Sequence, residues 1–209
     1  GVSYMKEATI VCFGDSITYG YCADYGTDYV SLLRKQLKED FPQMDITVKN
    51  KGENGETSRE GLRRLEGDVL HYNPQLVIML FGSNDCAFSD YQHRGVEEFE
   101  FNYDKIINAV QDSGSQLVLL TPPPVIEDDG MPFIENSVLN TYCDIIKRKA
   151  EEYGLMLIDM NKAFNGAAKG DLAPLLQWDG VHISTLGYKL FFETVYKHIK
   201  PLIEELAEK

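Results

Sequence analysis

Thr9-Ile10-Val11-Cys12-Phe13-Gly14-Asp15-Ser16 is the stretch that decides the fold. It begins with apolar and β-branched residues and is closed by Gly14 and Asp15, so residues 9–13 are predicted to form a buried strand. A run without polar alternation is typical of a parallel strand that is covered on both faces. Ser16 would then follow directly after the carboxyl end of this strand.

Similar apolar runs recur along the chain and predict four more strands, at residues 46–48, 76–81, 117–120 and 155–158. Apolar residues with helical spacing separate or follow them, at residues 62–70, 99–110, 139–150 and 190–202. This alternation predicts an α/β fold of three layers, with helices on both faces of a mostly parallel, five-stranded sheet. Pro201 is expected to kink or interrupt the last helix.

Length and charge restrict the protein class. The chain has 209 residues with 44% hydrophobic side chains, which predicts a single domain over residues 1–209. A net charge of -13 repels phosphate backbones, so nucleic acid is not an expected partner. The four cysteines show no metal-binding spacing and are interpreted as reduced thiols, with Cys86 near the site; no metal and no cofactor are expected.

The sequence also bears on location. It has no basic N-terminal segment followed by an apolar stretch, and no run of about 18 apolar residues, so no membrane span is expected. This favours a cytoplasmic protein, although Gly1 in place of methionine leaves a removed export signal open. The oligomeric state, including a homo-oligomer, is left open by the sequence.

Candidate catalytic groups follow the predicted strands. Ser16 lies at a tight turn where it could act as a nucleophile, but a serine there is also an ordinary helix cap. Asp179 stands three residues before His182, close enough to orient the imidazole toward Ser16, although such pairs often only cap a helix. His71 and His198 fall on predicted helices and are interpreted as surface or packing residues.

Acyl transfer also needs hydrogen-bond donors that face the tetrahedral oxyanion, each worth roughly 3 to 4 kcal/mol. Three candidates follow the strands: the backbone N–H of Ser16, the backbone N–H of Gly55 and the side-chain amide of Asn84. Each alone is also consistent with turn chemistry. Asp15 is expected to have a structural role, with its carboxylate turned into hydrogen bonds.

Taken together, four short motifs resemble the SGNH, or GDSL-type, hydrolase superfamily. They are Gly14-Asp15-Ser16, Asn54-Gly55-Glu56-Thr57, Gly82-Ser83-Asn84-Asp85 and Asp179-Gly180-Val181-His182, in family order. The resemblance implies a flavodoxin-like sheet with strand order 2-1-3-4-5, no metal, and hydrolysis of esters or thioesters through an acyl-enzyme. It implies Ser16, Asp179 and His182 as the triad and Ser16, Gly55 and Asn84 as the oxyanion hole.

Finer features are similar to the isoamyl acetate-hydrolysing esterase branch, on residues 81–87, 121–125 and 179–184, which favours short acyl esters. A carbohydrate deacetylase and a lysophospholipase or thioesterase of the same superfamily stay open, as does a non-catalytic flavodoxin-like binding module. Long loops at residues 86–97 and 122–135 should flank the site. Their residues, which line a small-molecule pocket or merely pack the loops, are Phe88, Tyr91 and Val125, with His93, Pro123 and Phe133.

Overall fold

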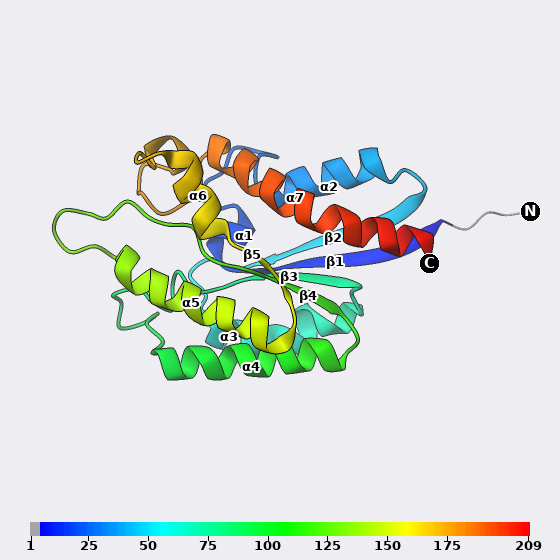
Figure 1. Ribbon diagram of the computed structural model, residues 1–209, viewed down its shortest axis with the longest axis horizontal. Helices are drawn as coiled ribbons and strands as arrows, with labels where there is room; N and C mark the ends of the chain where they lie inside the picture. Colours follow the sequence, from blue (N-terminus) through cyan, green and yellow to red (C-terminus); the bar gives the residue numbers. More distant parts are fainter. Residues whose placement is uncertain (1–4) are drawn as a thin grey trace, which may run out of the picture.

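The computed structural model describes residues 5–209, and its centre is a five-stranded sheet in the order β2-β1-β3-β4-β5. Every neighbouring pair of strands is parallel. The predicted α/β fold and its strand order are therefore confirmed (Figure 1). The strands are β1 (Lys6–Gly14), β2 (Met44–Gly52), β3 (Leu76–Leu80), β4 (Gln116–Leu120) and β5 (Met156–Ile158).

The edge strand β2 is much longer than the apolar run at residues 46–48 that predicted it. It pairs with β1 along its whole length, from Met44 opposite Lys6 to Gly52 opposite Gly14. Lys49, Asn50 and Lys51, which follow the apolar run, are polar and half exposed, because an edge strand is covered less completely than a central one. Apolar periodicity therefore found the strand but not its ends.

Helices cover both faces of the sheet in two groups (Figure 1). One face carries α2 (Tyr29–Asp40), α6 (Met160–Ala168) and α7 (Thr185–Glu208). The opposite face carries α3 (Ser58–Asp68), α4 (Val96–Asp112) and α5 (Asn136–Tyr153). Each group packs its own apolar cluster against the sheet. Short helical turns complete the chain: α1 (Ser16–Tyr19), η1 (Leu70–Tyr72) and η2 (Ala173–Leu175).

The helix α7 corrects one expectation. It runs from Thr185 to Glu208 without a break, so Pro201 does not interrupt it. Proline removes the hydrogen bond to the carbonyl four residues earlier, which belongs to Lys197. Both residues face solvent, where water can satisfy that carbonyl, while Ile199 and Ile203 keep the helix packed on the core.

Because all the strands are parallel, their carboxyl ends share one edge of the sheet, where open α/β sheets bind ligands. The chain leaves β1 at Ser16, β2 just before Gly55 and β3 just before Asn84. Three neighbouring strands thus deliver three of the predicted site residues to this edge. Among residues 5–209, no helix has both the length and the apolar character needed to cross a lipid bilayer.

Candidate active site

Ser16 is the first residue of the short helix α1, which begins directly after β1. Asp15 caps this helix, because its carboxylate accepts a hydrogen bond from the Ile17 N–H at 3.0 Å. The Tyr188 hydroxyl of α7 donates to the Ile17 carbonyl at 2.6 Å and holds the turn from the other side. The backbone N–H of Ser16 has no hydrogen-bond partner among residues 5–209 and so stays available to a ligand.

Asp179 and His182 lie in a tight turn at residues 176–183. An antiparallel bridge between Leu176 and Ile183 closes this turn. At its tip Gly180 has φ +72°, which favours glycine, and a Cβ there would crowd Ile126 at 3.0 Å. Both side chains therefore lie on one short turn that is closed by a backbone bridge.

The structure brings the three predicted triad residues into one line. The Ser16 Oγ lies 3.0 Å from Nε2 of His182. The other ring nitrogen, Nδ1, lies 2.5 Å from the Asp179 carboxylate. A carboxylate only accepts hydrogen bonds, so Nδ1 carries the proton and Nε2 is free to accept from Ser16.

Asp179 is held in its ionised form. Burial raises the pKa of this carboxyl, but hydrogen bonds from the His182 ring and from the N–H groups of His182 and Val181 outweigh it, and the net pKa is lowered. An ionised Asp179 can stabilise a positive charge on His182. The three residues thus have the geometry of a nucleophile, a base and an orienting acid.

The predicted oxyanion donors lie beside this line. Gly55 has φ +77° in the turn after β2, and its N–H has no hydrogen-bond partner among residues 5–209. Asn84 donates one amide hydrogen from Nδ2 to the Glu56 carbonyl at 2.9 Å, which leaves the second one free. The Glu53 N–H donates to the Gly14 carbonyl at 3.0 Å and ties the turn to the end of β1.

The model of the GDSL-like lipase/acylhydrolase family matches residues 12–190. The chain belongs to this family. Ser16 and the turn at residues 176–183, called the base turn after the predicted base His182, both fall inside the matched range.

Two curated relatives and one solved structure illustrate the family. An acetylxylan esterase of Geobacillus stearothermophilus is 27% identical, over 91% of this chain and 93% of the relative. An isoamyl acetate-hydrolysing esterase of Saccharomyces cerevisiae is 27% identical, over 98% of this chain and 91% of the relative. The structure of the W215I variant of Axe2, an acetylxylan esterase from G. stearothermophilus, has a TM-score of 0.78 at 27% identity and covers 92% of this chain and 94% of its own. This chain is therefore a GDSL-type esterase or acylhydrolase.

Three further structures of Axe2 are described as catalytic mutants, in which a serine, an aspartate or a histidine is replaced by alanine. They have TM-scores of 0.81, 0.80 and 0.80 to this chain at 25% identity and cover 95% of it and 96% of their own chains. In Axe2 the aspartate and the histidine stand three residues apart. Asp179 and His182 of this family member have the same spacing.

Two buried carboxylates lie beneath the site of this GDSL-type esterase. Burial, helped by nearby Asp85 and Glu56 and opposed by the hydrogen bond from Ile17, raises the pKa of Asp15 to about 7. Burial likewise raises the pKa of Asp85 to about 7. Asp85 accepts from the Ser58 hydroxyl at 2.6 Å and from the Ser58 N–H. Both carboxyl groups accept hydrogen bonds from backbone N–H groups next to the site, Asp15 from Ile17 and Asp85 from Ser58. The cap that Asp15 forms on α1 agrees with the structural role expected of it.

Among residues 5–209, the cysteines and the histidines other than His182 make no hydrogen bond to Ser16, Asp179 or His182. All four cysteines are free thiols, and Cys12, Cys86 and Cys143 are buried, which raises the pKa of each to about 12. Such thiols are unreactive. His71 is exposed in η1, and His198 lies on α7. Within residues 5–209, no group of three or more His, Cys, Asp and Glu is arranged to bind a metal ion.

The residues predicted to line a pocket fall in different places. Phe88 borders two shallow surface hollows, one shared with His93 and one with Phe133. Tyr91 is 90% exposed on the loop after β3. Val125 is only 3% exposed and packs in the cluster beneath α5, so its side chain belongs to the core.

Sequence reasoning missed two residues that contact the base turn. The Tyr21 ring packs against the His182 ring at an angle of 43°, with 4.5 Å between centroids. Gln177 donates to the Tyr21 carbonyl at 2.8 Å and to the Ile183 carbonyl at 2.9 Å. A hollow of about 650 Å³ beside this turn is lined by Asp179, Trp178 and Ile126 among others. The contacts that Tyr21 makes with the base turn leave no local signal in the sequence, because they join segments far apart along the chain.

Proposed function

We propose that this esterase hydrolyses short-chain acyl esters, and acetyl esters above all, through an acyl-enzyme on Ser16. The observation that carries the proposal is the unbroken line from the Ser16 Oγ through His182 to the Asp179 carboxylate, at 3.0 Å and 2.5 Å. Support comes from the Axe2 structures described as catalytic mutants at the same three residue types.

In the proposed cycle His182 accepts the Ser16 proton through Nε2 as Oγ attacks the ester carbonyl. Asp179 stabilises the imidazolium that forms. The N–H groups of Ser16 and Gly55 and the Asn84 amide donate to the oxyanion. His182 then gives its proton to the leaving alcohol, and water activated by the same nitrogen releases the acid and frees Ser16.

The side chains near the triad favour a short acyl group. A long chain needs an apolar cavity next to the nucleophile, and the hollow beside Asp179 is lined by the acidic residues Glu127 and Asp128 as well as by apolar ones. Val125, the apolar side chain predicted to receive it, is in the core. This favours acetate over the longer esters of a lysophospholipase or thioesterase.

A panel of p-nitrophenyl esters from acetate to palmitate tests the proposal. We expect kcat/KM to be highest for acetate and to fall with acyl length, and we expect Ser16→Ala to abolish turnover without a change in melting temperature. Ser137→Ala, an exposed serine at the start of α5, is the matched control. An undiminished rate in Ser16→Ala, or no labelling of Ser16 by a fluorophosphonate probe, would contradict an enzyme of this mechanism and favour the binding module.

An acetylated sugar is the second candidate substrate, favoured by the aromatic side chains around the base turn. Trp178, next to Asp179, is 94% exposed, and Tyr21, which packs against His182, is exposed as well. Flat, exposed rings can stack on sugar rings. The relatives named acetylxylan esterase agree with this class. Acetylated xylose in the same panel, with Trp178→Ala, tests it: the sugar is the substrate if the variant raises KM for acetylxylose and not for p-nitrophenyl acetate.

The partner and the compartment belong to the same proposal. We infer a small-molecule ester as the ligand, no nucleic acid, and action in the cytoplasm. Fractionation of cells that express the full-length protein tests the compartment, and recovery of the esterase outside the cytoplasmic fraction would contradict it.

A further inference from the structure

The turn after β2 carries Gly55, the glycine of the proposed oxyanion hole. Gly55 is exposed and adopts φ +77°, and a glycine rotates about its backbone bonds at little steric cost. Its N–H belongs to the peptide before it and its C=O to the peptide after it. A rotation at Gly55 would therefore turn the proposed donor away from the Ser16 side of the site.

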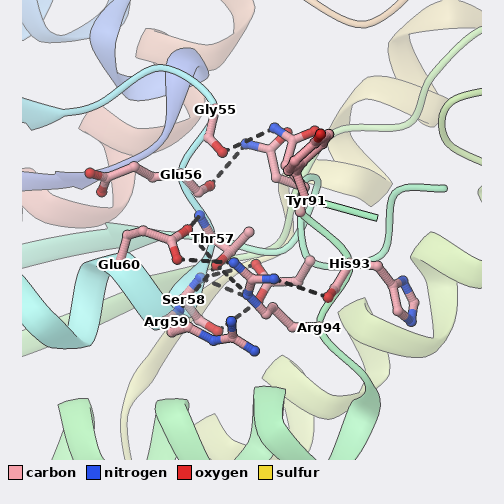
Figure 2. A network of polar contacts seen from close by, with 12 residues as sticks. Gly55, Glu56, Thr57, Ser58, Arg59, Glu60, Tyr91, His93 and Arg94 are labelled. Atoms are coloured by element: carbon pink, nitrogen blue, oxygen red, sulfur yellow. Dashed lines mark hydrogen bonds and ion pairs between the residues drawn. The ribbon is translucent and has the colours of Figure 1, made fainter. Parts of the chain in front are cut away.

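Side chains from the loop after β3 hold the peptides that follow Gly55. Gln92 donates from Nε2 to the Gly55 carbonyl oxygen at 3.0 Å. Asn84 donates from Nδ2 to the next carbonyl, that of Glu56, at 2.9 Å. Figure 2 shows both carbonyl oxygens engaged in this way. Neither bond comes from the turn itself, so the glycine turn is held by a different strand connection.

Both ends of that loop are anchored in the interior. At its start, the buried Asp85 accepts from the N–H and the hydroxyl of Ser58, the first residue of α3. At its end, Arg94 is 8% exposed and donates from Nε to the Thr57 hydroxyl oxygen at 3.1 Å. Its guanidinium also pairs with Glu60 at 3.1 Å, as Figure 2 shows.

The contacts of Asp85 and Arg94 hold both ends of the loop that carries Gln92. It stands two residues before Arg94, and its side chain is half buried on the turn. In the same loop, the Arg94 N–H donates to the Asp85 carbonyl at 2.8 Å and closes the two ends onto each other. A loop closed in this way presents the Gln92 amide in a defined position.

We propose that Gln92 is a positioning residue of this esterase, whose amide fixes the peptide after Gly55 and so keeps the Gly55 N–H directed at the oxyanion. Gln92 contacts the turn and not the reacting atoms. The inference rests on the proposed function, because it assigns Gln92 a role in the oxyanion hole of that reaction. Asn84 then has two tasks, one amide hydrogen holding Glu56 and the other facing the oxyanion.

Two variants of nearly unchanged size test the role of Gln92. Gln92→Met removes the donor, and Gln92→Glu replaces it with an acceptor next to a carbonyl oxygen. Loss of a whole oxyanion donor costs roughly 10²- to 10³-fold in kcat, so a misdirected one should cost about 10- to 100-fold. We expect this fall in kcat for p-nitrophenyl acetate, larger for Glu than for Met, with KM unchanged within about threefold.

A structural role alone would move other quantities. The melting temperature of both variants should stay within about 2 °C of the parent protein, because Gln92 is at the surface. Inhibition by an alkylboronic acid, whose tetrahedral adduct on Ser16 places an oxygen in the hole, should weaken in proportion to kcat/KM. The matched control is Gln111→Glu: Gln111 also donates to a backbone carbonyl, that of Tyr153 at 3.3 Å, but from α4.

The outcomes separate this inference from the proposed function. If Ser16→Ala is inactive and Gln92→Glu keeps kcat within twofold, Gln92 has no positioning role and only this inference falls. A lower kcat that is matched by a lower melting temperature, or that leaves boronate inhibition unchanged, overturns it too. If Ser16→Ala keeps its rate, both proposals fall together.

Discussion

The base turn at residues 176–183 and the oxyanion turn around Gly55 lie at the same edge of the sheet but are built differently. The base turn is local: Asp179 and His182 stand three residues apart, and the Leu176–Ile183 bridge closes the turn on itself. The oxyanion turn depends on distant residues, because Asn84, Gln92 and Arg94 reach it from the loop after β3.

This difference shows what each half of the site needs. The base turn requires only a correct local sequence, and one carboxylate both shapes the turn and orients the ring. The oxyanion turn has a glycine with positive φ at its centre, and side chains from a second loop hold the carbonyls of Gly55 and Glu56. Substitutions outside the turn should therefore affect the oxyanion half more than the base half.

Asp179→Asn should have the largest effect and act on chemistry alone. The amide oxygen can still accept the N–H groups of Val181 and His182, but the amide cannot hold the ring in the required tautomer. We expect kcat to fall about 10⁴-fold with little change in melting temperature. The control is Asp171→Asn, an exposed aspartate that also accepts the N–H two residues on. A fall of less than tenfold would show that Asp179 only shapes the turn.

Asn84→Ala should have the next largest effect, because it removes a donor and the bond to the Glu56 carbonyl. We expect a fall of about 10²- to 10³-fold in kcat, measured on p-nitrophenyl acetate. Combined with Gln92→Glu, the losses should be less than additive, since both variants release the same turn. Asn140→Ala on α5 is the control. Strict additivity of the two losses would show that the residues act independently.

Asp85→Asn should have the smallest effect, seen in stability as a function of pH. The pKa of Asp85 is about 7 in the native protein against 3.8 in its ordinary state, so between these values the native state binds more protons. The free energy of unfolding must therefore fall as the pH rises from about 4 to about 7. Removing the carboxyl removes this slope.

Measured by denaturant unfolding at pH 4 and pH 8, the stability of Asp85→Asn relative to the parent should improve with pH by on the order of 4 kcal/mol. The buried Asp15, with its pKa of about 7, leaves a slope of the same sign in both proteins. Asp45→Asn on the exposed edge of β2 should show no such change. A pH-independent difference for Asp85→Asn would mean that Asp85 is ionised throughout.

Most of the fold could be predicted from the sequence, because buried parallel strands leave continuous apolar runs. All five strands and the helices α3, α4, α5 and α7 lie where those patterns indicated. Two helices were not predicted. α2 has a readable signal, an Asp28 cap followed by buried Val30, Leu33 and Leu37. α6 is short and contains Gly166, so its apolar spacing is too sparse to detect.

The candidate site was predicted well where its residues are close in sequence and poorly where they are far apart. Ser16 and the base turn are readable because each motif is contiguous in sequence. Gln92 is not, since its partner Gly55 lies in another strand connection. Val125 was expected to line a pocket, but Asn136 pairs with both its N–H and its C=O and draws it into the core. Such long-range contacts leave no periodic trace.

The separation of the core into two apolar layers has a consequence for how the enzyme loses activity on heating. Leu176 and Ile183 pack the base turn into the apolar cluster under α7. Phe81 and Cys86 pack the start of the loop after β3 into the cluster under α4. Loosening of either layer would misplace one half of the site while the sheet persists. Thermal inactivation should therefore precede loss of the sheet, and hydrogen exchange should show which layer opens first.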